Sequence, residues 1–156
     1  MTNRPKAIGT AAESGVVKSL HTRAVPAQRV ALHGTQDMGD VWAWPLDTGG
    51  ARVVFEVKAG QQTRNPSWRQ VDEWFAEAWR ESARVPGCDL GVLVLKRHGS
   101  GNADDWFAYV HLNEYVLLTV DYGPNRGVLT DHGIVAQLRL GHLLDHLTHH
   151  YARNPE

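Results

Sequence analysis

Hydrophobic and polar positions along the chain follow two periods, one typical of strands and one typical of helices. Residues 90–95 (LGVLVL) form a continuous apolar run, as expected for a central strand buried on both faces. Residues 40–44 and 52–58 predict two strands joined by a Pro/Gly-rich turn, PLDTGG. In chain order, the expected elements are a helix at 10–22, strands at 28–32, 40–44 and 52–58, a helix at 66–83, strands at 90–96 and 105–111, a short helix or loop at 113–120 and a helix at 131–151. This order predicts an α/β fold with helices packed on a mixed central sheet.

Two of these helices carry start signals. Thr10 is expected as the N-cap of the first, because Thr10-Ala-Ala-Glu13 matches the spacing of a capping box, and residues 1–7 are expected as a flexible basic arm. The helix at 66–83 starts with a proline. Its expected buried face consists of Trp68, Val71, Phe75, Ala78 and Trp79. Most of the six tryptophans are therefore expected in the core, with base stacking as the alternative.

The C-terminal segment is rich in histidine. On a helix, its apolar stripe would consist of Leu140, Leu143, Leu144, Leu147 and Tyr151. His142, His146 and His149 then share the opposite face, where a solvated polar surface is the simplest interpretation. Two histidines four residues apart on a helix leave a zinc or nickel site as the alternative.

Length and composition indicate a single domain spanning residues 1–156. Hydrophobic residues make up 42% and charged residues 21% of the chain, which is ordinary for a globular protein. The longest apolar run is too short to cross a bilayer, and the first ten residues lack the apolar core of a signal peptide. A single cysteine, Cys88, excludes an internal disulfide framework, so a cytoplasmic location is expected.

The charge distribution changes this picture at one end of the chain. The net charge of −1 argues against a protein that coats nucleic acid by bulk attraction. Residues 1–36, however, carry five basic side chains against one acidic side chain, +5 − 1 = +4. This third of the chain could form a local phosphate-binding face or simply a solvated helix and tail.

Three charged residues interrupt segments that otherwise have the pattern of buried strands. Glu56 and Lys58 are two apart, so they share one face of their strand. If the turn is symmetric about Thr48, Asp40 lies opposite Glu56. Opposed residues of a hairpin have Cβ atoms about 5 Å apart, and two half-buried carboxylates at that separation repel each other. A hard divalent cation such as Mg²⁺ would relieve the repulsion.

Glu13 extends this acidic group. It falls on the expected buried stripe of its helix, together with Val16, Val17 and Leu20, where a carboxylate requires a partner. Both a capping role and a metal-binding role remain open for it. Simpler alternatives exist for the others, since Asp40 could be a turn residue and Glu56 with Lys58 a solvated ion pair. The combination of all four residues favours a site.

These motifs resemble a known family. The pattern GD…VVFEVK, with Asp40, Glu56 and Lys58, resembles the core of the PD-(D/E)xK nucleases, with Gly39 in place of the usual proline. The segment KAIGTAAESGVVKSL resembles the first helix of the Holliday junction resolvases in this superfamily, whose early glutamate matches Glu13. CDLGVLVLKRHG and DWFAYV resemble the strands that follow in phage and bacterial resolvase-like members. The resemblance covers roughly residues 6–112 and implies a restriction-endonuclease-like core.

The resemblance implies a metal-dependent endodeoxyribonuclease. Asp40, Glu56 and the Val57 carbonyl would hold one or two Mg²⁺ or Mn²⁺ ions, and Glu13 would bind metal directly or through water. Lys58 would orient or help to deprotonate the attacking water, and cleavage would leave a 5′-phosphate and a 3′-hydroxyl. The expected DNA contacts are Lys6, Lys18 and Arg29, with Gln61 and Gln70 near the scissile phosphate.

The resemblance also implies a homodimer, because two opposed sites suit the approximate two-fold symmetry of a four-way junction. Either Trp68, Phe75 and Trp79 or the terminal helix could form the interface. Three alternatives remain: a repair or restriction-type nuclease with the same core, a non-catalytic DNA-binding module that keeps the fold, and a metal-binding protein that uses the histidine tail. The intact set of Asp40, Glu56 and Lys58 argues against the non-catalytic module.

Overall fold

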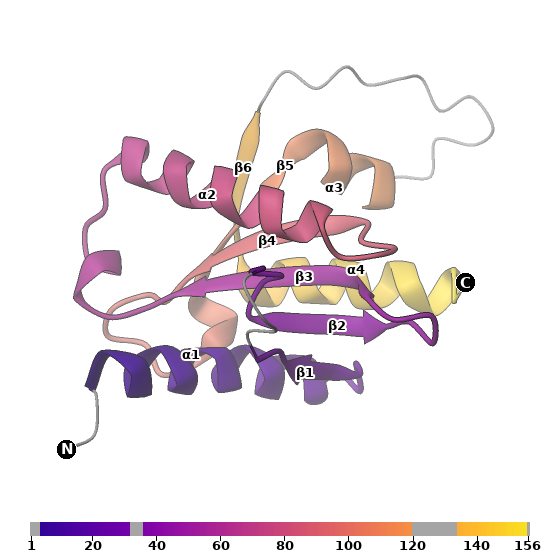
Figure 1. The fold of residues 1–156 in the computed structure, drawn as a ribbon, viewed down its shortest axis with the longest axis horizontal. Coiled ribbons are helices and arrows are strands. Elements are labelled where there is room, and N and C mark those ends of the chain that lie inside the picture. The colour runs from indigo at the N-terminus through magenta and orange to yellow at the C-terminus, as the bar shows by residue number, and fades with distance from the viewer. Residues whose placement is uncertain (1–3, 32–35, 120–133, 156) are drawn as a thin grey trace.

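The computed structural model describes residues 4–31, 36–119 and 134–155 (Figure 1). Its elements are α1 (Arg4–His21), β1 (Ala27–Arg29), β2 (Val41–Pro45), β3 (Ala51–Lys58), the 3₁₀ turn η1 (Gln61–Thr63), α2 (Trp68–Ala83), β4 (Leu90–Leu95), the 3₁₀ turn η2 (Ala103–Asp105), β5 (Phe107–His111), α3 (Leu112–Thr119), β6 (Val135–Arg139) and α4 (Leu140–Arg153). The predicted α/β fold with a mixed central sheet is confirmed. It is compatible with a restriction-endonuclease-like core.

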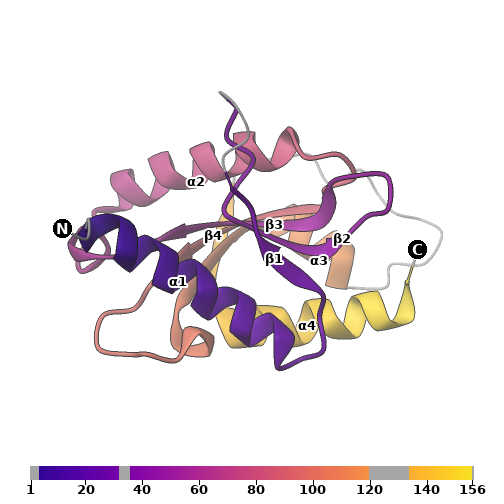
Figure 2. The same ribbon diagram turned by 60° about the horizontal axis from the view of Figure 1, so that its bottom comes forward.

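The six strands lie in the sheet in chain order, from β1 to β6. All neighbours are antiparallel except β3 and β4, which are parallel and are joined through α2. Figure 2 shows α2 on one face of the sheet and α1 with α4 on the other. Parallel neighbours require a crossover of this kind, and the crossover helix covers the face that carries Glu56 and Lys58.

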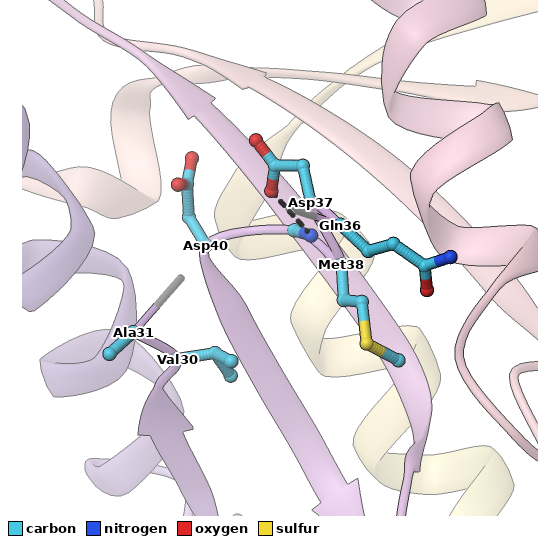
Figure 3. Close-up of a pocket in the computed structure, with 7 residues that line it drawn as sticks. Val30, Ala31, Gln36, Asp37, Met38 and Asp40 are labelled. Carbon is cyan, nitrogen blue, oxygen red and sulfur yellow. Dashed lines mark hydrogen bonds between the residues drawn. The ribbon is translucent and has the colours of Figure 1, made fainter. Parts of the chain in front are cut away.

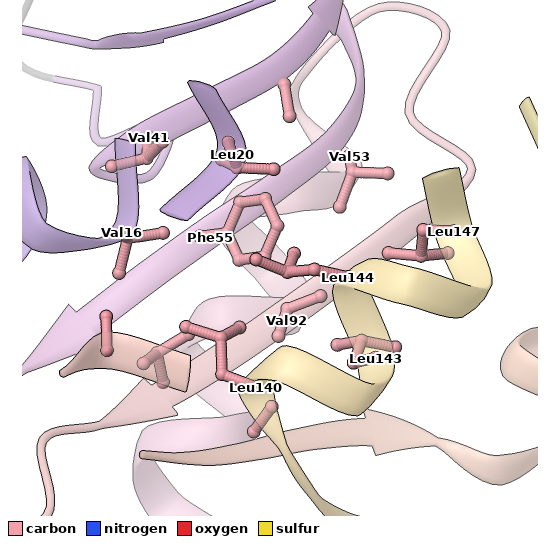
Figure 4. Packing of buried hydrophobic residues seen from close by; sticks show 14 of the residues in the cluster. Val16, Leu20, Val41, Val53, Phe55, Val92, Leu140, Leu143, Leu144 and Leu147 are labelled. Carbon is pink, nitrogen blue, oxygen red and sulfur yellow. The ribbon is translucent and has the colours of Figure 1, made fainter. Parts of the chain in front are cut away.

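Alternation along β3 divides the core into two parts. Val53, Phe55 and Val57 face α1 and α4, where they pack against the leucines of α4 (Figure 4). The other part of the core lies between α2 and the sheet. It contains Val71, Trp74, Phe75 and Ala78 of α2, together with Leu93, Leu95 and Tyr109 of the sheet. The predicted apolar stripe of the terminal helix is confirmed, since all five of its residues are buried. His142, His146 and His149 are exposed, as expected.

The first helix begins earlier than predicted. It starts at Arg4, with Pro5 in its first turn, where a proline costs no helical hydrogen bond. Thr10 therefore lies inside the helix, and the predicted capping box with Glu13 is wrong. Residues 4–7, expected in a flexible arm, are helical, while residues 1–3 lie outside the described part.

The terminal segment is divided between two elements. Residues 135–139, predicted as helix, are strand β6, which pairs antiparallel with the edge of β5. Ala136 and Leu138 pack against the core, whereas Gln137 and Arg139 are exposed, so the segment follows the period of a strand. The helix begins only at Leu140. Residues 131–133 lie outside the described part.

The tryptophans differ from expectation. Only Trp74 and Trp106 are buried, and Trp68 and Trp79 are 72% and 39% exposed. The expected buried face of α2 is thus rotated, with Trp74 in place of Trp68 and Trp79. Among the described residues, no helix combines the length and apolarity needed to cross a lipid bilayer.

Candidate active site

The hairpin of β2 and β3 has the predicted register. Val41 pairs with Phe55 and Trp42 with Val54, so the turn is symmetric about Thr48. One residue before β2, the Asp40 N–H donates to the Phe55 carbonyl at 2.9 Å. Gly39 precedes it with φ of +81°, and a Cβ there would lie 2.4 Å from Val54 Cγ1. A proline, whose φ is fixed near −65°, cannot occupy this position, which explains the departure from the Pro-Asp motif.

The Asp40 side chain is fixed against the edge of β3. Its Oδ2 accepts a hydrogen bond from the Val57 N–H at 2.8 Å. Burial, together with the nearby charge of Glu56, raises the pKa of Asp40 to about 8. The N–H and C=O of a strand residue point to the same side, so the Val57 carbonyl lies on the edge that faces Asp40. Both of these predicted metal ligands therefore lie on one edge.

Glu56 lies on the α2 face of the sheet and is only 6% exposed. Its Oε1 accepts a hydrogen bond from Lys58 Nζ at 2.8 Å, whereas its Oε2 has no hydrogen-bond partner among the described residues. Burial raises the pKa of Glu56 to about 7 despite the opposing charge of Lys58. Lys58 therefore pairs with Glu56 on the α2 face, while Asp40 lies just beyond the Val41–Phe55 pair that ends the β2–β3 ladder, close enough for the charge of Glu56 to raise its pKa.

Helix α2 adds two acids that the sequence analysis did not include. Glu77 Oε1 lies 3.6 Å from Lys58 Nζ, and Glu81 lies beside Glu56 with 4% exposure. Four residues of helix and two residues of strand both span about 6 to 7 Å. Glu77 and Glu81 on α2 are therefore spaced to match Lys58 and Glu56 on β3. A sequence signal existed for Glu81, because it continues the buried stripe of Val71, Trp74 and Ala78.

A further acid comes from the segment that leads into β2. Asp37, Glu56 and Glu81 each offer a carboxylate oxygen within 4.8 Å of the others. Asp37 Oδ1 also accepts a hydrogen bond from the Gly39 N–H at 3.3 Å. Figure 3 shows the Asp37 and Asp40 side chains projecting in the same direction beside a small pocket of about 60 Å³. No period of the sequence marks Asp37, since it lies in a loop.

Glu13 reaches the site from α1, on the other face of the sheet from α2. Its Oε2 accepts a hydrogen bond from Arg29 Nε at 2.8 Å, so it is already paired. Its charge still contributes to the raised pKa of Asp40. The structure thus places Glu13 beside the site but gives its carboxylate a cationic partner.

The predicted DNA contacts are scattered. Lys6 and Lys18 are exposed on α1, while Arg29 is engaged with Glu13. Gln70 lies in the first turn of α2, where its N–H donates to the N-cap Ser67 at 3.1 Å. Of the five residues, only Gln61 lines a described groove near the end of β3.

This groove has a volume of about 420 Å³. Its lining is Ile8, Gly60, Gln61, Thr63, Lys96, His98, Gly99, Ser100 and Gly101. Gly60, two residues after Lys58 along the chain, is part of this lining. Among the described residues, Lys96 and His98 line it and no acidic side chain does. Sequence reasoning did not assign these two residues, which follow directly from the central strand.

Compared with known protein families, with curated proteins and with solved structures, the chain matches none.

Proposed function

We propose that the protein is a metal-dependent endodeoxyribonuclease of the PD-(D/E)xK type that cleaves branched DNA in the manner of a Holliday junction resolvase. One observation carries the proposal: Asp40 lies close to Glu56 at the end of a hairpin, and Lys58 pairs with Glu56. Two buried acids and one lysine are an unstable combination in an apolar core. They suit a site that holds a divalent cation against a phosphate.

The donor set fits a hard cation, since Asp40, Glu56 and the Val57 carbonyl offer oxygen atoms only. Bound Mg²⁺ or Mn²⁺ would lower the pKa of a water ligand and neutralise charge on the phosphate. The charge and hydrogen bond of Glu56 outweigh the effect of burial and raise the pKa of Lys58, so its ammonium group stays charged. Lys58 is thereby suited to stabilise negative charge on the phosphate and to orient the attacking water.

The groove beyond β3 supports DNA as the substrate. Lys96 and His98, which line the groove together with Gln61, would contact phosphates of the strand that enters the site. Lys6 and Lys18, exposed on α1, would add contacts outside the groove. Phosphate contacts of this kind position a strand without reading its sequence, as a structure-selective nuclease requires.

The preference for a branch rests on the resemblance in the sequence, as does the homodimer. Phe75 is buried between α2 and the sheet, so it is not available for an interface. Trp68 and Trp79, on the same helix, are exposed and are available for one. The cytoplasm of a bacterial cell or of a phage-infected host is the proposed location. A repair or restriction-type nuclease would use the same site, so substrate choice separates these alternatives.

The test is cleavage of labelled four-way junction, flap, linear duplex and single-stranded DNA with Mg²⁺ or with EDTA. We expect paired symmetric nicks near the branch point, lost in EDTA and reduced at least about 100-fold by Asp40→Asn or Glu56→Gln. Cleavage of linear duplex at one sequence would indicate a restriction-type enzyme. DNA binding without cleavage in either Mg²⁺ or Mn²⁺ would leave only a binding module.

A further inference from the structure

We propose that Asp37, Glu56 and Glu81 form a second divalent-cation site on the α2 side of Glu56. The three residues come from three elements: the segment before β2, strand β3 and helix α2. Their carboxylate oxygens lie within 4.8 Å of one another. Oxygen atoms at metal–ligand distances of about 2.0 to 2.6 Å from one ion are separated by such lengths.

The two glutamates point to a ligand independently of their spacing. Glu56 is 6% exposed and Glu81 is 4% exposed, so both are more than nine-tenths buried. The Oε2 atom of each is shielded from solvent and has no hydrogen-bond partner among the described residues. The two carboxyl groups hydrogen-bond to each other while one of them is protonated, but once both are ionised each buried oxygen has lost its hydration and gained nothing in return. One cation between the two residues would satisfy both oxygen atoms.

The charge balance around the cluster supports the same assignment. Lys58 pairs with Glu56 Oε1 at 2.8 Å and lies 3.6 Å from Glu77, so one ammonium group serves two acids. Arg84 donates to the Asp37 main-chain carbonyl at 3.2 Å, and no hydrogen bond from it to the Asp37 carboxylate is present among the described residues. Asp37, Glu56 and Glu81 thus bring three carboxyl groups together with one shared cationic partner.

The surrounding structure holds the three ligands in place. The Arg84 contact ties the Asp37 segment to the C-terminal end of α2, one turn from Glu81. Ser82 Oγ donates to the Trp79 carbonyl at 2.8 Å and packs over Gly91 of β4, which fixes the height of this turn above the sheet.

The second site deepens the proposed function and, for its role in cleavage, rests on it. Glu56 would bind one cation with Asp40 and another with Asp37 and Glu81. A cation on the α2 side would release Lys58 from Glu56, which frees the ammonium group for the phosphate. Binding itself does not depend on any nuclease activity.

Binding of Mn²⁺ to the metal-free protein, measured by electron paramagnetic resonance of the free ion, tests the proposal without DNA. We expect two ions per chain in the wild type, one in Glu81→Gln and one in Asp40→Asn, with the lost ion weakened more than about 10-fold. Glu73→Gln is the matched control, because Glu73 is an exposed acid of the same helix paired only with Arg69. It should keep both ions.

Melting temperatures provide a second readout that a folding defect cannot imitate. Glu81→Gln should melt at or above the wild-type temperature in EDTA, because it removes a buried charge, and should lose part of the increase that Mn²⁺ gives the wild type. One ion in the wild type with unchanged affinity in Glu81→Gln would overturn the second site while leaving the nuclease proposal intact. Two ions without DNA cleavage would overturn the nuclease and keep the site.

Discussion

Lys58 has two acidic neighbours, and each limits what its ammonium group can do. Glu56 holds it at 2.8 Å on the strand, and Glu77 approaches to 3.6 Å from α2. In the metal-free protein, the lysine therefore mainly offsets the charge of Glu56. In the proposed nuclease, a cation that takes over that role would leave the lysine available to a phosphate, so its contribution would belong to the reaction and not to metal binding.

Lys58→Met should separate these two roles. The substitution keeps the length of the side chain and removes the charge, so we expect DNA cleavage to fall about 100-fold or more. Affinity for Mn²⁺ should be retained or increased, because Glu56 loses the ammonium group that competes with the cation. Single-turnover cleavage and metal titration measure the two effects.

Glu77→Gln is the control for Lys58→Met. Glu77 is partly exposed and 3.6 Å from the ammonium group, so its removal should change cleavage by less than about 5-fold. Loss of metal binding in Lys58→Met, together with loss of cleavage, would show that the lysine is needed only to keep the site folded.

Sequence reasoning reached Asp40, Glu56 and Lys58 because a hairpin constrains them. Strand residues alternate faces, and a symmetric turn fixes which residues oppose each other, so local rules suffice. Asp37 and Glu81 depend on how α2 lies over β3, which no local period encodes. The apolar stripe of α2 did mark Glu81 as a buried acid, by the same signal that singled out Glu13.

The contact between α2 and β4 sets the position of the acids that α2 carries. Gly91 lies in β4 under Ser82, and a Cβ added there would lie 2.3 Å from Ser82 Oγ and 2.8 Å from Ser82 Cβ. Neither atom can move far, because Ser82 is buried and helical. A larger residue at 91 must therefore lift the last turns of α2 from the sheet.

Gly91→Ala tests this at the level of the element. We expect a loss of about 1 to 3 kcal/mol in the free energy of unfolding and a weaker Mn²⁺ site at Glu81, with the Asp40 site less affected. Gly101→Ala is the matched control, since nothing lies within 4 Å of its added Cβ. Urea unfolding and metal titration measure both effects. Equal stability of the two variants would contradict the close contact.

Two elements escaped prediction for reasons of context. Residues 135–139 directly precede a strongly amphipathic helix, so the sequence pattern alone assigns them to that helix. In the structure they pair with the edge of β5 as a strand. Thr10 fits the pattern of a helix N-cap, but α1 begins at Arg4, with Pro5 in its first turn. For α1 the type of element is predicted and only its start is wrong, whereas for residues 135–139 the type itself is wrong, because it depends on pairing with β5.

At the scale of the whole molecule, ionisable groups act in two separate pH ranges. Arg23 bonds to Asp104 and Asp145, and so links α1 to η2 and α4. The hydrogen bond from Arg23 lowers the pKa of Asp104 below its usual value, so this link weakens only in acid, below about pH 4. The buried acids of the site act at higher pH and with the opposite sign.

Burial raises the pKa of Asp40 to about 8 and that of Glu56 to about 7 in the folded chain. The folded state therefore binds more protons than the unfolded state, whose carboxyl groups titrate near pH 4. Their contribution to stability is complete below about pH 4 and is lost as the pH rises to about 8. In EDTA, the melting temperature should fall by several degrees between about pH 5 and 8.5. Asp40→Asn should make the melting temperature depend less on pH. Mg²⁺ should stabilise the wild type most at the alkaline end of the range, because there the ion replaces protons that the acids no longer hold. A melting temperature that rises over this interval in EDTA would contradict the raised pKa values.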